Sequence, residues 1–165
     1  MSEILDRGRA AADKIGDLLG PIVSRFPEDQ QPLVLAQLER NAARRYREWA
    51  EAANDEAETH GLLACATREE EVAATVELSA GSADDVTAML TAHLPELREA
   101  YDSVFGGKNR LEQMAVQAAA ERLGASVWKQ LARTEWGKPR AVELKRCANL
   151  EEQSAAYLEE LLGGD

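Results

Sequence analysis

Apolar side chains recur at steps of three and four along most of this chain, a spacing typical of amphipathic helices. In the first half they predict a leading helix over 4–19, a second helix that starts near Pro32, and a third helix over about 56–78. Gly20-Pro21 is expected to interrupt the leading helix, because proline lacks the amide hydrogen of a helix interior. The loop 26–29 separates the first two helices, and Asn54-Asp55 is the expected turn between the next two.

The second half follows the same course. Apolar positions predict a leading helix over about 86–104, in which Pro95 is a perturbation, and a long pair of helices over 115–160. Gly106-Gly107 ends the leading helix, and the segment 136–139 is the expected turn of the pair. The small residues of 79–83 form the one clear linker, which lies near the middle of the chain.

The two halves match at a fixed shift of 82 positions. Glu39-Arg40 falls on Glu121-Arg122 without any gap in the alignment. At the same shift a leucine, a cysteine and further glutamates coincide: Leu62 with Leu144, Cys65 with Cys147, Glu69-Glu70 with Glu151-Glu152, and Glu77 with Glu159. Self-similarity at one period indicates duplicated structural units. We therefore expect two internal repeats, approximately 3–78 and 85–160.

These patterns predict an all-α protein forming a single helical domain over 1–165. Each repeat supplies one leading helix and one antiparallel hairpin, and two hairpins pack into a four-helix bundle. Hydrophobic residues make up 45% of the chain, many of them alanine, whereas aromatic residues make up 5%. Such a composition favours closely packed helices.

Acidic residues lie on the apolar stripes where packing alone would favour leucine. Glu39 and Glu121 occupy such positions on the first helix of each hairpin, and Glu69 and Glu151 on the second. Hairpin geometry places them, with their neighbours Glu70 and Glu152, at one height in the bundle. Burial of an ionised carboxylate costs several kcal/mol. Like charges at close range also raise the pKa values of neighbouring carboxyl groups. Metal ions, Arg40 and Arg122, protonation, or exposure at the bundle rim would each compensate.

On these residues the chain resembles the ferritin-like superfamily, with one hairpin at 33–78 and a second at 115–160. In that family the first helix of a hairpin supplies a Glu and the second a Glu-x-x-His. Two hairpins then surround two iron or manganese ions. The resemblance implies a bundle of this type and a metal centre, with Fe or Mn as the expected ion. It leaves open whether the protein is an enzyme.

The histidines of that motif are missing from this sequence. If Glu70 and Glu152 take the glutamate positions, Ala73 and Ala155 stand where histidine is expected. The resemblance then implies a carboxylate site of Glu39, Glu70, Glu121 and Glu152. The alternates Glu69 and Glu151 would put Val72 and Ser154 at the histidine positions. Oxygen-only ligands suit Mn²⁺, Mg²⁺ or Ca²⁺.

The rival interpretation is a protein-interaction module that keeps the fold without a metal and binds a protein partner or a second copy of itself. Inward-pointing Arg40 and Arg122 would favour it, because they would neutralise the acids. A net charge of −11 argues against nucleic acid or an anionic membrane as the main partner. The sequence shows no membrane-length apolar run or secretion signal, and Cys65 and Cys147 are expected to be buried thiols. These features predict a reduced, cytoplasmic protein.

Overall fold

The computed structural model describes residues 2–80 and 84–163, and within them the protein is all-helical, with no strand. These residues form six α-helices and one short 3₁₀ helix. In chain order they are α1 (Ser2–Val23), α2 (Gln31–Glu51), α3 (Glu56–Ala80), α4 (Asp84–Phe105), α5 (Arg110–Leu131), η1 (Lys138–Arg140) and α6 (Ala141–Gly163).

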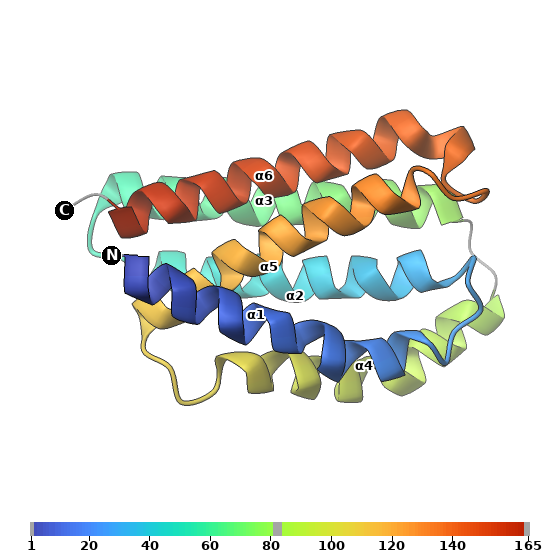
Figure 1. The fold of residues 1–165 in the computed structure, drawn as a ribbon, viewed down its shortest axis with the longest axis horizontal. Helices are drawn as coiled ribbons and strands as arrows, with labels where there is room; N and C mark the ends of the chain where they lie inside the picture. The colour runs from blue at the N-terminus through green and yellow to red at the C-terminus, as the bar shows by residue number, and fades with distance from the viewer. Residues whose placement is uncertain (1, 81–83, 164–165) are drawn as a thin grey trace.

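The predicted hairpins are present. The helices α2 and α3 pack along each other as one antiparallel pair, and α5 and α6 as the other (Figure 1). The two pairs meet mainly through α3 and α6. On the opposite side, α1 packs against α5 and α4, while α4 packs against α2. The backbones of α2 and α5 make little direct contact, so α1 and α4 cover the gap between them.

Two apolar clusters fill the hairpin bundle, one toward each end. Tyr46, Leu62 and Leu158 belong to the first cluster, and Trp128 and Leu144 to the second; all five are at most 2% exposed. On each of the four hairpin helices the residues of one cluster are separated from those of the other by a glutamate. These four glutamates therefore form a polar layer between two apolar halves of the core.

The prediction that Gly20-Pro21 interrupts the leading helix is wrong, because α1 continues through both residues to Val23. Proline at position 21 removes the one hydrogen bond that its own amide would have donated. Burial of Leu19 and Ile22 against α4 and the start of α2 offsets that loss. Pro95 likewise lies inside an unbroken α4.

The linker predicted at 79–83 begins later than expected, since α3 extends to Ala80; residues 81–83 lie outside the described part of the chain. Within the described ranges, no helix has both the length and the apolar character that crossing a membrane requires.

Candidate functional site

Four carboxyl groups meet at the centre of the bundle, one from each hairpin helix. Glu69 of α3, Glu121 of α5 and Glu151 of α6 are at most 1% exposed. Glu39 of α2 is half-buried. One carboxylate oxygen from each of Glu39, Glu69 and Glu151 lies within 4.8 Å of the other two. Three helices thus bring their acids within reach of a single small ion, and Glu121 adds a fourth at the same layer.

Neighbouring side chains hold one oxygen of each buried carboxylate. The Tyr46 hydroxyl and the Gln117 amide donate to Oε1 of Glu121, at 2.8 and 2.7 Å. The Trp128 indole N–H donates to Oε1 of Glu151 at 3.0 Å, and the Ser154 hydroxyl donates to Oε1 of Glu69 at 2.8 Å. These bonds fix the orientation of the carboxylates from outside the cluster.

The second oxygens of two of these acids are unpaired. Oε2 of Glu69 and Oε2 of Glu121 are fully buried, and no N–H or hydroxyl group of the described residues donates to either. Glu151 lies close enough to Glu39 and Glu121 to share a proton with each of them. A buried acceptor without a donor is costly, by about 1–3 kcal/mol. The cluster therefore needs protons or a bound cation.

The raised pKa values of the four acids also indicate that the cluster needs protons or a cation. Burial is the main cause that raises the pKa of Glu39, Glu69, Glu121 and Glu151 above the ordinary range of a glutamate. The charge of Glu121 adds to this at Glu39 and Glu69. Among nearby cations, Arg68 acts in the opposite sense on the pKa of Glu69 and Glu121. Four ionised carboxylates in this volume cannot coexist without further positive charge.

The two arginines that might have supplied that charge lie on the outside of the bundle. Arg40 binds Glu77 through two hydrogen bonds of 2.9 and 2.6 Å, and it also contacts Glu70. Arg122 makes the corresponding pair of bonds, 3.1 and 2.6 Å, to Glu159. Because both guanidinium groups are engaged at the surface, they do not neutralise the central acids.

Glu70 and Glu152, which the resemblance placed in the metal site, do not join the cluster. Glu70 is half-exposed and pairs with Arg40 and Arg47, while Glu152 pairs with Lys129. Adjacent residues on a helix point about 100° apart, so only one of each neighbouring pair can face inward. The inward acids are the alternates, Glu69 and Glu151, in phase with the buried Cys65 and Cys147.

Several residues at the site escaped the sequence interpretation. Tyr46 and Trp128 both donate hydrogen bonds to the acids. Gln117 carried no signal, and Ser154 was noted only as the residue at a vacated histidine position. Gly124 did carry one, because a glycine inside a helix costs about 1 kcal/mol relative to alanine. A Cβ atom at position 124 would lie 2.6 Å from Oε2 of Glu151, so this glycine makes room for the carboxylate.

The cysteines and histidines take no part in the cluster. Cys65 and Cys147 are buried, and burial raises the pKa of each thiol to about 12, so both are inert thiols as expected. His60 is exposed, and His93 lies on α4, where its ring packs against Phe26.

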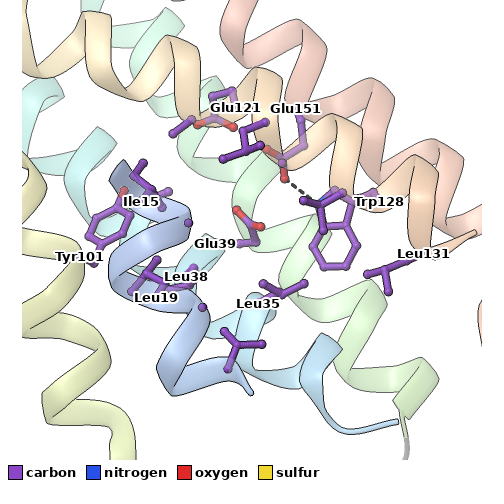
Figure 2. A pocket seen from close by; sticks show the side chains of 18 of the residues that line it. Ile15, Leu19, Leu35, Leu38, Glu39, Tyr101, Glu121, Trp128, Leu131 and Glu151 are labelled. Carbon is purple, nitrogen blue, oxygen red and sulfur yellow. Dashed lines mark hydrogen bonds between the residues drawn. The ribbon is translucent and has the colours of Figure 1, made fainter. Parts of the chain in front are cut away.

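A cleft leads to the cluster from the side covered by α1. Its volume is about 340 Å³, and residues of α1, α2 and α5 supply most of its walls. Glu39, Glu121 and Glu151 line it together with apolar side chains such as Ile15, Leu35 and Trp128 (Figure 2). The acids are consequently reached from a mainly apolar space.

Comparison with known proteins adds no constraint. No protein-family model, no curated protein and no solved structure matches the chain. The arrangement itself offers four oxygen ligands, two of them with an unsatisfied buried oxygen, beside an apolar cleft.

Proposed function

We propose that this protein is a ferritin-like helical protein that binds a divalent metal ion through Glu39, Glu69, Glu121 and Glu151. The observation that carries the proposal is the approach of three carboxylate oxygens to within 4.8 Å of one another, beside the unpaired Oε2 atoms of Glu69 and Glu121. A cation would satisfy these atoms and remove the repulsion among the acids.

The ligand set favours a hard cation. All four groups are carboxylates, and no histidine is near enough to contribute an imidazole among the described residues. Carboxylate sites suit Mn²⁺ and Mg²⁺, and Fe²⁺ is the other ion that the ferritin-like resemblance implies. Ser154 occupies the place three residues after Glu151 where the family motif has histidine, and its hydroxyl instead orients Glu69.

Elemental analysis of the purified protein, followed by thermal melting of metal-stripped protein with Mn²⁺ or Fe²⁺, tests the proposal. A ligand at about one hundred times its Kd stabilises the folded state by about 2.7 kcal/mol. We expect this stabilisation to disappear in the double variant E69Q/E151Q. The matched control E70Q/E152Q changes the adjacent acids, which pair at the surface, and should keep it. Equal metal-dependent stabilisation in both variants would refute the proposed ligands.

A second candidate function is docking of a protein partner on the bundle end near the start of α6. Leu78 and Val142 are 87% and 80% exposed. Arg140 ties the two chain segments together there, donating to the carbonyl of Ser79 at 3.1 Å. If no metal binds, affinity capture with wild-type protein and with L78S/V142S is the next experiment, and a partner lost in the variant would support this function.

A further inference from the structure

The cleft above the acids has the size of a small-molecule site. Its volume of about 340 Å³ is roughly twice that of an apolar cavity that holds benzene, about 150 Å³. Its walls come mainly from α1, α2 and α5, and α4 and α6 each add one residue, Tyr101 and Glu151. Pockets of this size and apolar character, with few polar groups, are typical of ligand sites.

The helix that covers the cleft is built to leave it open. Gly16 lines the cleft from α1, and a Cβ atom placed there would meet nothing within 4 Å. Because glycine in a helix interior costs about 1 kcal/mol relative to alanine, its presence at this position is not explained by stability.

The inner side of the cleft carries three carboxyl groups with which no lysine or arginine of the described residues forms an ion pair. Figure 2 shows Glu39, Glu121 and Glu151 on the cleft wall between α1 and Trp128. Oε2 of Glu121 is buried without a donor. Arg40 and Arg122 are engaged with surface acids, and Arg68 does not line the cleft. A ligand that fits must therefore be apolar along most of its length and positively charged at one end.

We propose that the cleft binds a small amphiphilic amine, with its ammonium group among Glu39, Glu121 and Glu151 and its hydrocarbon part against Ile15, Leu35 and Leu38. An ammonium group supplies three N–H donors, which matches three carboxylates. The hydrocarbon part buries apolar surface at about 25 cal/mol per Å². This site goes beyond metal binding: it requires the same acids but no metal, so the amine and a metal ion compete for them.

Titration calorimetry of metal-stripped protein with n-octylammonium tests the proposal. Octanol and octanoate serve as neutral and anionic probes of the same chain length. We expect octylammonium to bind at least about tenfold more tightly than octanol, since a hydrogen bond to a charged group contributes about 1.5–3 kcal/mol. Octanoate should not bind. Failure of octylammonium to bind, or equal binding of octanol, would overturn the proposal.

Two variants of α1 locate the ligand. Gly16→Leu places a side chain in the cleft and should weaken octylammonium binding at least about tenfold, while melting no lower than wild type because glycine is a poor helix former. Asp17→Leu adds the same side chain at an exposed neighbour that does not line the cleft, and should bind as wild type. Wild-type affinity in Gly16→Leu would show non-specific attraction of a cation to an acidic protein, and equal loss in both variants would show that the loss does not depend on the cleft; either result would overturn the site. None of these outcomes bears on the metal test, which uses other variants and no amine.

Discussion

Replacement of Glu121 by glutamine tests most directly how much the buried carboxyl charges destabilise the folded protein. Glutamine has nearly the same shape, and its oxygen keeps the hydrogen bonds from Tyr46 and Gln117, which are 2.8 and 2.7 Å in the wild type. Its NH₂ group takes the place of Oε2, which has no donor, and faces Glu151 as a donor. The substitution therefore removes one buried charge without breaking a bond.

The expected gain depends on pH. Burial raises the pKa of Glu121, and its charge raises the pKa of Glu39 and Glu69. A carboxyl whose pKa is raised by folding stabilises the protein fully below its ordinary pKa, and this contribution is lost as the pH rises through the folded-state value. Each unit of pKa shift corresponds to about 1.4 kcal/mol. We expect metal-free Glu121→Gln to be more stable than wild type by about 1–3 kcal/mol at pH 8, and by less at pH 5.

Urea or thermal unfolding of metal-stripped protein at the two pH values measures this gain. For a protein of this size, 1 kcal/mol shifts Tm by about 2–4 °C. Glu152→Gln is the control, since this acid pairs with Lys129 at the surface and its replacement should change stability by no more than about 0.5 kcal/mol. A lower stability of Glu121→Gln at pH 8, or the same gain at pH 5 and pH 8, would refute the reasoning.

Three further predictions concern the buried acids and thiols of the bundle. Metal-free wild type should melt at a lower temperature at pH 8 than at pH 5, because folding raises the pKa values of its central carboxyl groups. Saturating Mn²⁺ should remove most of that difference in Tm. A higher metal-free Tm at pH 8 would contradict this prediction. A thiol-reactive dye at pH 8 should label Cys65 and Cys147 only after unfolding, since burial raises the pKa of both thiols to about 12; rapid labelling of the native protein would contradict it. Gly124→Ala should reduce metal-dependent stabilisation, because its Cβ displaces the Glu151 carboxylate; unchanged metal stabilisation would argue against Glu151 as a ligand.

The helical period of the sequence was enough to predict the hairpin helices, since a stripe with a 3.6-residue period must be buried against another element. It also predicted the layer of acids. The resemblance favoured Glu70, with Ala73 at the vacated histidine position, whereas the carboxyl group that lies in the central cluster is that of Glu69. Glu69 lies on the same face of α3 as Leu62 and Cys65, and this is the face that is buried in the bundle.

Other features could not be predicted from one sequence. The cleft depends on how far α1 and α4 hold α2 and α5 apart, which is a property of tertiary packing and has no local pattern. The hydrogen bond from Ser154 to Glu69 joins residues of different hairpins. The continuation of α1 through Pro21 could not be predicted, because it depends on the tertiary contacts that bury Leu19 and Ile22.

The most direct measurement of the central claim is an anomalous difference map from crystals of metal-stripped protein soaked in Mn²⁺. The proposed site predicts a peak coordinated by Glu39, Glu69 and Glu151, with Glu121 at the same centre. A map with no peak among these carboxylates, or with manganese only at Glu70 or Glu152 on the surface, would contradict it.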